Sequence, residues 1–218
     1  MSERRGRPTL PAILPIFPLT AVLLLPRGQL PLNIFEPRYL AMTRDAMAGD
    51  RLIGMVQPRD PQQSMAGNPP VYPTGCAGLV TEFAETQDSR LLITLTGLCR
   101  FRIGEELPLS SGYRRVVPDW RPFLADLAGE EDADFDRQRL LQSLRTYFGR
   151  NRISVNWEAL AAVRSERLVV SLAMVCPFAP SEKQALLEAA DLGARARLLT
   201  TIVEMAGLAP AAEGGARH

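Results

Sequence analysis

The chain has 218 residues, 46% of them hydrophobic and 22% charged, and its 25 basic and 24 acidic side chains leave a formal net charge of +1. A chain of this length can bury a normal hydrophobic core without disulfides or metal. The balanced charge argues against a nucleic-acid-binding protein. Because the only histidine, His218, is the last residue, the chain lacks the usual general base and metal ligand, and we expect no catalytic residue, no metal site and no cofactor.

The first predicted elements lie in residues 14–38, where prolines at positions 15, 18, 26 and 31 divide the apolar runs. Proline is excluded from helix interiors and central strands, so each run is short. Residues 22–25 form a strand-sized apolar run, and residues 30–34 alternate apolar and polar positions as a half-buried strand does. Such short runs favour a crossed, barrel-like sheet, and the prolines argue against the apolar core of a signal peptide.

Residues 36–49 change to a helical period. Apolar side chains recur every three or four positions, Pro37 fits the first helical position and Gly49 fits the end, so we predict one helix. Residues 52–57 then predict a buried strand. Residues 58–73 carry five prolines, which indicate a long surface loop that we expect to be mobile.

Residues 75–82 and 91–96 predict an antiparallel hairpin around positions 87–89. Gly97 is expected to break the second strand, after which residues 97–103 continue the sheet. Residues 113–117 predict the last strand. Residues 10–122 are therefore typical of a mostly β module with one helix.

Beyond Phe123 the pattern becomes helical, after a short connector that is acidic at residues 130–132. Ser181 and Gln184 have the spacing of a capping box, which would start one of the helices. Five helices are predicted, at residues 135–149, from Trp157, at 167–176, from Ser181, and at 193–206.

Five segments resemble, in the same order, the Lon N-terminal (substrate-binding) domain family: LPIFPL, LPLNIFEPRY, the strand after the first helix, GLCRFRI, and SEKQALLEAADLGARARLLTTIVEM. The resemblance covers residues 10–206. It implies an α+β fold in which a PUA-like pseudo-β-barrel with one helix is followed by a C-terminal α-helical bundle. We accordingly expect a disordered N-terminal arm (1–9), the barrel subdomain (10–122), an acidic connector (123–132), the helical bundle (133–207) and a disordered tail (208–218).

The same resemblance implies a recognition module, and we expect it to stand alone without the ATPase and Ser-Lys protease modules of full-length family members. The sequence has no G-x-x-x-x-G-K-[ST] loop and no G-x-S-x-G elbow, and a Ser-Lys dyad would have to use Lys183, the only lysine. We therefore expect a cytoplasmic, non-enzymatic protein that binds unfolded or degron-bearing polypeptides in protein quality control. An ATP-dependent protease is a candidate partner, and a membrane is not.

The expected substrate contacts include the charged turn before the first helix, at Glu36, Pro37 and Arg38, which the resemblance associates with substrate. The proline-rich loop adds Met65 and Tyr72, because a reader of unfolded chains needs adaptable apolar surface. The alternative is that Glu36 and Pro37 only start the helix, while Arg38 is solvated or paired to an acid.

RNA binding is the main alternative function, because PUA-like barrels also occur in RNA-binding proteins. The arginines that would then contact phosphates are Arg4, Arg5, Arg7, Arg114 and Arg115. The balanced charge and the absence of lysine-rich or aromatic platform motifs argue against it, so nucleic acid is not an expected partner. A hydrolase of unrecognised type is a further alternative.

Other conspicuous residues have structural explanations. Cys76, Cys99 and Cys176 lie in apolar runs, so we expect buried free thiols in a reducing compartment. Arg100 is expected to bond backbone carbonyls at the barrel rim, and Trp120 is expected to anchor the junction between the two parts of the chain.

Overall fold

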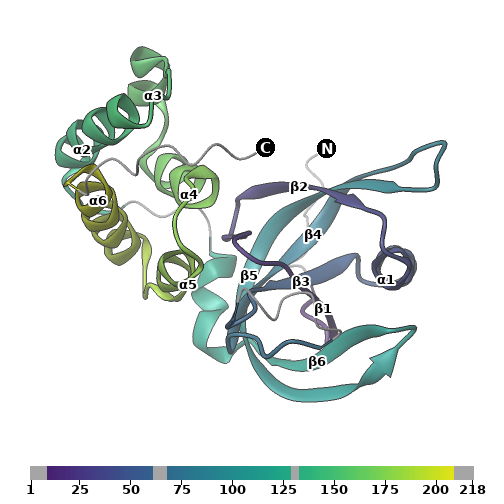
Figure 1. Cartoon of the computed structure of the whole chain (residues 1–218). Helices are drawn as coiled ribbons and strands as arrows, with labels where there is room; N and C mark the ends of the chain where they lie inside the picture. The colour runs from purple at the N-terminus through teal and green to yellow at the C-terminus, as the bar shows by residue number, and fades with distance from the viewer. Residues whose placement is uncertain (1–8, 61–67, 129–132, 209–218) are drawn as a thin grey trace, which may run out of the picture.

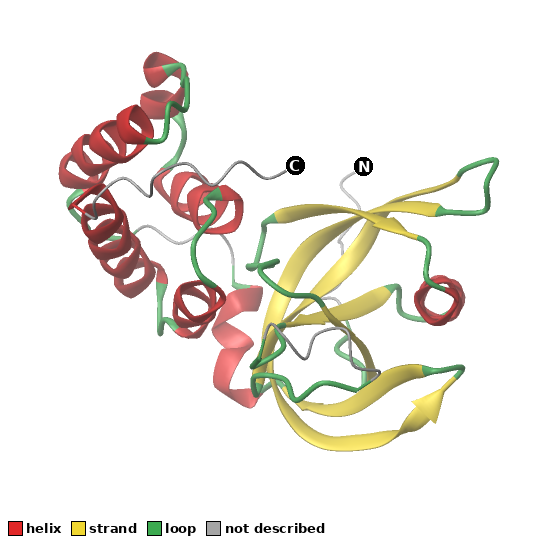
Figure 2. Ribbon diagram, in the orientation of Figure 1, coloured by secondary structure: helices red, strands yellow, loops and turns green. Residues whose placement is uncertain are grey.

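The computed structural model describes residues 9–60, 68–128 and 133–208. Figure 1 shows two halves side by side, one of strands with helix α1 and one of helices α2–α6, and Figure 2 shows the short helix η2 between them. The strands are β1 (Leu14–Pro18), β2 (Gln29–Ile34), β3 (Leu52–Val56), β4 (Thr74–Glu85), β5 (Leu91–Ser110) and β6 (Tyr113–Asp119). The helices are α1 (Pro37–Ala48), the 3₁₀ helix η2 (Arg121–Leu127), α2 (Arg137–Arg150), α3 (Trp157–Ala162), α4 (Ser165–Val175), α5 (Pro180–Glu188) and α6 (Leu192–Leu208).

The six strands pair in the order β2-β5-β4-β3-β1-β6, and β6 also pairs with the far end of β5. Five strands therefore close into a ring, while β2, among the strands described, pairs with β5 alone. The long strand β5 makes the closure possible, because its first half pairs with β2 and β4 and its second half with β6. This arrangement agrees with the crossed, barrel-like sheet that the short apolar runs predict.

Two hydrophobic clusters stabilise the structure. One joins residues of five strands, from β1 to β6, and contains Phe101, against which Trp120 packs with ring centroids 5.7 Å apart. The other is continuous across both halves, since it contains Ile34 and Leu95 of the sheet together with Leu144 and Leu199 of the helices. The two halves thus share one hydrophobic core, so their junction is part of the fold.

Most of the predicted elements are present. The helix expected at residues 36–49 is α1, with Glu36 as its N-cap, Pro37 at its first position and Gly49 at its C-cap. The expected buried strand is β3, all of whose residues are buried, and the expected hairpin is β4–β5. The helices expected at residues 135–149, from Trp157, at 167–176 and at 193–206 correspond to α2, α3, α4 and α6 within a few residues.

The strand suggested by residues 22–25 is wrong. These residues belong to no strand of the sheet, and Leu23, Leu24 and Leu25 are buried in the shared core instead. Left-handed backbone at Ala21 (φ 60°) and Arg27 (φ 64°) bounds the segment. The continuous apolar run correctly indicated that these residues are buried. It did not indicate that they are buried by packing in the shared core rather than by pairing within the sheet.

The expected break at Gly97 is also wrong, because β5 continues through it with only a register shift against β4. A Cβ at this position would lie 2.0 Å from the carbonyl oxygen of Leu25. The close approach is held by two backbone bonds, from the Arg27 N–H to the Gly97 oxygen (2.7 Å) and from the Gly97 N–H to the Gly28 oxygen (2.8 Å). Gly97 therefore allows another segment to contact the strand.

The capping box predicted at Ser181 and Gln184 is wrong by two residues. Helix α5 has Ala179 as its N-cap and Pro180 in its first turn, and Glu182 accepts a hydrogen bond from the Ala179 N–H at 2.7 Å. Gln184 is buried and donates to the carbonyl oxygen of Thr74 at 3.1 Å. Tertiary contact with the sheet, rather than capping, explains this glutamine.

The expected connector at residues 123–132 is partly helical. Helix η2 occupies Arg121–Leu127 and buries Asp126. Residues 129–132 lie outside the described residues, as do residues 1–8, 61–67 and 209–218. The predictions of a disordered arm at 1–9 and tail at 208–218 fall largely on those residues, and the prediction of mobility in the loop at 58–73 falls on them in part.

Candidate functional site

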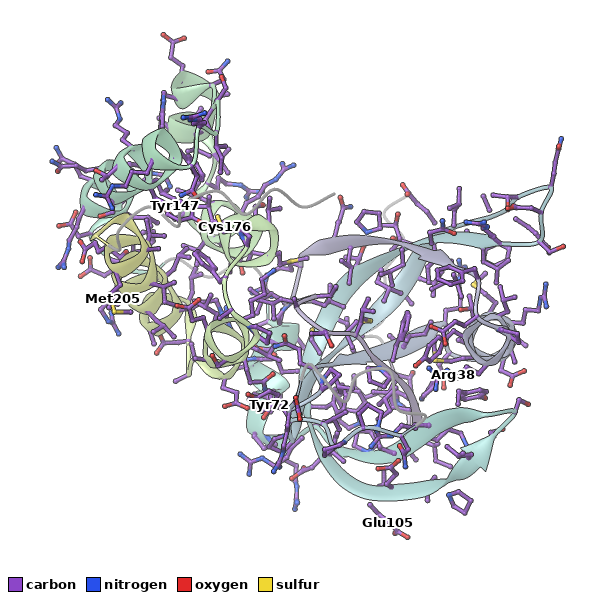
Figure 3. The ribbon with its side chains drawn as sticks, in the orientation of Figure 1. Arg38, Tyr72, Glu105, Tyr147, Cys176 and Met205 are labelled. Atoms are coloured by element: carbon purple, nitrogen blue, oxygen red, sulfur yellow. The ribbon has the colours of Figure 1, made fainter. Side chains whose placement is uncertain are left out.

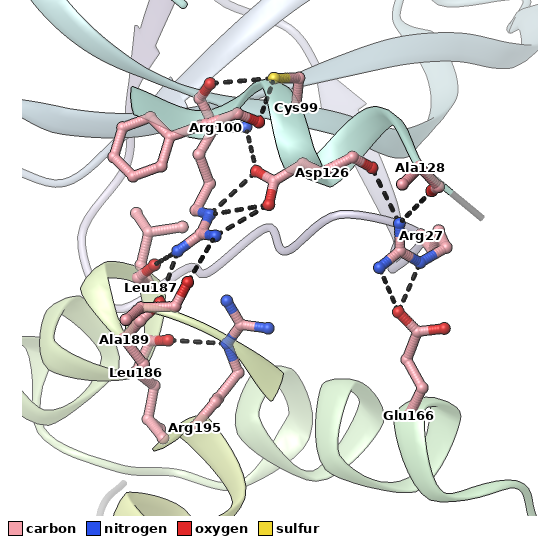
Figure 4. A network of polar contacts seen from close by, with 12 residues as sticks. Arg27, Cys99, Arg100, Asp126, Ala128, Glu166, Leu186, Leu187, Ala189 and Arg195 are labelled. Carbon is pink, nitrogen blue, oxygen red and sulfur yellow. Dashed lines mark hydrogen bonds and ion pairs between the residues drawn. The ribbon is translucent and has the colours of Figure 1, made fainter. Parts of the chain in front are cut away.

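A buried ion pair at the base of η2 ties the two halves together (Figure 4). Arg100, only 4% exposed, donates to both carboxylate oxygens of Asp126, at 2.9 Å from Nε and 2.8 Å from Nη2. Its Nη1 donates to the carbonyl oxygens of Leu187 (3.1 Å) and Ala189 (2.6 Å) at the C-terminal end of helix α5. The expectation that Arg100 bonds backbone carbonyls is confirmed, and every part of its guanidinium is committed to structure.

The thiol of Cys99 lies beside this pair and donates to the carbonyl oxygens of Arg100 (3.2 Å) and Phe123 (3.3 Å). Burial, followed by the negative charge of Asp126, raises the pKa of Cys99 to about 12. Cys76 and Cys176 are likewise buried free thiols, and burial raises the pKa of both. None of the three has the lowered pKa of a nucleophilic cysteine.

Lys183 is the second cation at the junction, and its Nζ donates to the carbonyl oxygens of Ala21 and Met174, each at 3.0 Å. Burial lowers the pKa of Lys183, partly offset by Cys176. Both oxygens that accept from Nζ belong to the backbone rather than to a serine. The ammonium therefore fixes helices α4 and α5 to the segment before β2, and it is not arranged as half of a Ser-Lys dyad.

Between the halves lies a hollow of about 650 Å³, which we call the junction groove. One wall is formed by residues 21–31, which lead into β2, and the other by residues 164–175, which form α4 and its N-cap. Its lining is about equally polar and apolar, and the apolar part includes six aliphatic side chains. They are Val22, Leu23, Leu30, Val170, Met174 and Val175.

Charged residues stand at one end of the junction groove. Arg27 and Glu166 form an ion pair across it, with Nε and Oε1 2.5 Å apart, and Arg27 also donates to the Asp126 carbonyl oxygen at 2.9 Å. Arg167 is exposed beside them. At the other end Val175 is 81% exposed, so an apolar side chain faces solvent where the helix could have carried a polar one.

A second, shallower hollow of about 440 Å³ lies on the outer face of β2, β5 and β4. Phe83 and Leu92, both partly exposed, line it, and Pro31 belongs to both hollows. Phe35, at the end of β2, is 62% exposed. Apolar surface therefore continues from the junction groove along the sheet toward the start of α1.

The predicted contacts Glu36, Pro37 and Arg38 lie at that helix start. Arg38 Nη2 is 2.9 Å from Glu36 Oε2, and its guanidinium lies over the ring of Tyr39 at 4.5 Å from the centroid. Burial raises the pKa of Tyr39, which Arg38 partly offsets. These contacts match the alternative in which Arg38 is paired to an acid, and they leave its role toward a substrate untested.

Tyr72 and Arg38 are not brought together, since Figure 3 shows them at opposite ends of the β-rich half. Tyr72 is half-buried, and its N–H donates to the Gln57 carbonyl oxygen at 2.9 Å. Met65 lies outside the described residues. The junction groove was missed from the sequence: its signal is the exposed stripe Arg167, Ser171 and Val175, four residues apart on a helix that otherwise reads as apolar.

Of the arginines proposed for RNA contact, the two that the structure describes are engaged within the β-rich half. Arg114 is buried, pairs with Glu106 at 2.7 Å and donates to the Pro69 carbonyl oxygen at 2.7 Å. Arg115 donates to the Pro108 carbonyl oxygen at 3.3 Å, and Arg4, Arg5 and Arg7 lie outside the described residues. Among the residues that the structure describes, no three metal-binding side chains cluster, and no helix is long and apolar enough to cross a membrane.

Comparison with known proteins gives one consistent family. Residues 13–205 match the family model of the ATP-dependent protease La (LON) substrate-binding domain. Lon protease 2 of Myxococcus xanthus is 27% identical over an alignment of 205 residues that covers 89% of this chain and 24% of that protein. Lon protease of Desulfosudis oleivorans is 25% identical over an alignment of 199 residues that covers 88% of this chain and 24% of that protein. The chain thus spans about a quarter of the length of these two relatives.

Two solved structures of Lon N-terminal domains are similar to this fold. The crystal structure of a Lon N-terminal domain protein from Xanthomonas campestris has a TM-score of 0.58 at 22% identity, and the match covers 87% of this chain and 97% of that chain. The N-terminal domain of a Mycobacterium avium complex Lon protease also has a TM-score of 0.58, at 14% identity. This mixed sheet with its helices is therefore the fold of Lon N-terminal domains.

Proposed function

We infer the function from one premise, that the chain belongs to the ATP-dependent protease La (LON) substrate-binding domain family. On this basis the protein is a substrate-recognition module. It binds unfolded or degron-bearing polypeptides by non-covalent contacts, in protein quality control, and an ATP-dependent protease is its proposed partner. We propose that it acts in the cytoplasm.

The junction groove is the observation that carries this proposal. Unfolded polypeptides have no common sequence, but all expose apolar side chains and unpaired backbone groups. The groove offers an aliphatic lining that includes the exposed Val175, and it lies beside the start of β2, whose second edge pairs with no other described strand. A helix face and a strand edge together can accept both kinds of group.

The turn at Glu36, Pro37 and Arg38 is a second proposed contact surface. It adjoins the exposed Phe35 at the end of β2, and residues 31–33 of the same strand line the second hollow, which shares Pro31 with the junction groove. Met65 and Tyr72 are proposed contacts as well.

The fold supports the proposed division of the chain. We interpret the closed ring of strands as a PUA-like pseudo-barrel over residues 10–122 and the helices of residues 133–207 as a bundle, joined by residues 123–132. The barrel and the bundle each supply one wall of the junction groove. The recognition surface then depends on both parts and belongs to neither alone.

A non-enzymatic role is consistent with the reactive side chains that the structure describes. The three thiols are buried with raised pKa values, and the ammonium of Lys183 bonds two backbone carbonyls. The RNA alternative has no comparable support, because Arg114 is buried against Glu106.

The proposal is tested with a fluorescent client protein that is reduced and carboxamidomethylated, so that it stays unfolded without added charge. We expect anisotropy to report saturable binding to this client, little binding to its native form, and no turnover of ATP or peptide. Ser171→Trp should weaken binding at least tenfold by filling the junction groove, whereas Gln138→Trp, at an exposed position on α2, should not. Equal binding by both variants would place the site elsewhere, and no binding by the wild type would refute the function.

A further inference from the structure

We propose that the junction groove selects segments in which an acidic residue and an apolar residue are three or four positions apart. This inference rests on the proposed function, because it names the class of polypeptide that the same groove prefers. It predicts a sequence bias within unfolded substrates rather than binding of any exposed apolar stretch.

The charge of the groove supports the acidic position. Three arginines line it, Arg27, Arg164 and Arg167, but only one carboxylate, that of Glu166, which already pairs with Arg27. Within the part of the chain that the structure describes, Arg167 makes no hydrogen bond or ion pair. A carboxylate that enters this end of the groove therefore meets a guanidinium that no acidic side chain of the groove neutralises.

The geometry of α4 sets the spacing. Arg167, Ser171 and Val175 follow one another at intervals of four residues, so they lie along one side of the helix. Eight residues of α-helix rise about 12 Å. An extended chain covers this distance in roughly three or four residues. A peptide that lies along α4 can thus pair an acidic side chain with Arg167 and place an apolar one against Val175.

The opposite wall limits how much of the affinity can come from the peptide backbone. Gln29 and Leu30 of β2 line the groove, but Pro31 follows and has no N–H to donate. Strand addition along β2 is therefore interrupted after two residues. The groove then distinguishes peptides by their side chains. The charge and the spacing of those side chains therefore determine the affinity.

A polypeptide fits this lining better than a nucleic acid does. The residues that line the junction groove include no aromatic ring, and bases bound without sequence preference need such rings to stack on. The aliphatic side chains cannot bind phosphate groups, and the cationic end of the groove is short. We accordingly assign the groove to an acidic, apolar segment of protein.

The test uses labelled ten-residue peptides with blocked ends, containing one Glu and one Leu four positions apart on a Gly-Ser background. The wild type should bind this peptide about fivefold more tightly than the same peptide with Lys in place of Glu, the size of one exposed ion pair. Moving Glu next to Leu should remove the advantage. Arg167→Glu should reverse the preference in favour of Lys, and Arg167→Gln should abolish it.

Arg197→Glu is the matched control, since it makes the same charge change at an exposed position on α6 outside the groove. It should keep the wild-type preference. Equal binding of the Glu and Lys peptides, with the unfolded client still bound, would overturn the inference and leave the proposed function standing. Loss of all binding to peptides and client would refute both. Tighter, Arg167-dependent binding of an RNA oligonucleotide would overturn the assignment to polypeptide.

Discussion

Arg100 and Asp126 show at the scale of single residues why the junction between the halves is rigid. Their charges are buried, and the guanidinium also bonds carbonyl oxygens at the end of α5. Taking such charges out of water is costly, so each depends on its partner being in place. The pair therefore couples the position of α5 to the position of strand β5.

Removal of the arginine should be severe. We expect Arg100→Met to lower the free energy of unfolding by about 3–5 kcal/mol, because Asp126 is then left buried without its counter-ion. Urea denaturation measures this change. Arg121→Met is the control: it breaks the exposed pair with Asp119 and should leave stability nearly unchanged. A similar loss of unfolding free energy in the two variants would show that the buried Arg100 pair contributes no more to stability than the exposed Arg121 pair.

Cys99 gives a prediction for pH. Burial and the charge of Asp126 raise the pKa of Cys99 from 9.0 to about 12 in the folded protein. Between these values the unfolded thiol has lost its proton and the folded one has kept it, so the free energy of unfolding falls as pH rises from about 9. The free energy of unfolding of Cys99→Ala should fall less steeply with pH between about pH 9 and about pH 12, measured by urea denaturation at each pH. An identical slope in the variant would contradict the assignment.

At the scale of elements, Gly97 allows residues 22–25 to pack closely against strand β5. A Cβ there would lie 2.0 Å from the Leu25 oxygen, so Gly97→Ala should lower the free energy of unfolding by about 1–3 kcal/mol. Gly149 in α2 has no atom within 4 Å of the equivalent position, and Gly149→Ala should stabilise by about 0.4–1 kcal/mol. Thermal and chemical denaturation test the pair. Unchanged stability in the Gly97→Ala variant would mean that the two segments separate easily.

The same elements show what could be predicted from the sequence. Local signals were sufficient for α1, where Pro37 and Gly49 bound a helical period, and for the β4–β5 hairpin. They failed where a distant segment decides the outcome. Residues 22–25 are buried without pairing because they fill the space between sheet and helices, and Gly97 accommodates them from about 70 residues away. Periodicity reports burial, but not which neighbour supplies it.

The candidate site was harder to predict than the fold. The turn at Glu36, Pro37 and Arg38 could be proposed because it lies in one continuous motif that resembles the family, and its role toward a substrate stays a prediction. The junction groove joins residues 21–31 to residues 164–175, and no local pattern brings these together. The one local clue was the exposed stripe of Arg167, Ser171 and Val175, which carries meaning only once the helix is placed against its neighbours.

At the scale of the whole molecule, the shared core predicts a single cooperative transition. The two tryptophans report on separate halves, Trp120 against Phe101 in the sheet and Trp157 against Phe148 in the helices. We expect the variants Trp120→Phe and Trp157→Phe, each followed by the fluorescence of the remaining tryptophan, to unfold with the same midpoint as the circular dichroism signal of that variant. A fluorescence midpoint that departs from it would show that the halves unfold separately.

The central claim is that substrate polypeptide lies in the junction groove, and site-directed crosslinking tests it most directly. A photoreactive maleimide would be attached at Val175→Cys and, as control, at Leu109→Cys, which is also exposed but lies near the β5–β6 turn. The native thiols are buried and should not react. We predict that the unfolded client crosslinks strongly from position 175 and weakly from position 109. Equal crosslinking from both positions, or stronger crosslinking from position 109, would contradict the assignment of the groove as the recognition site.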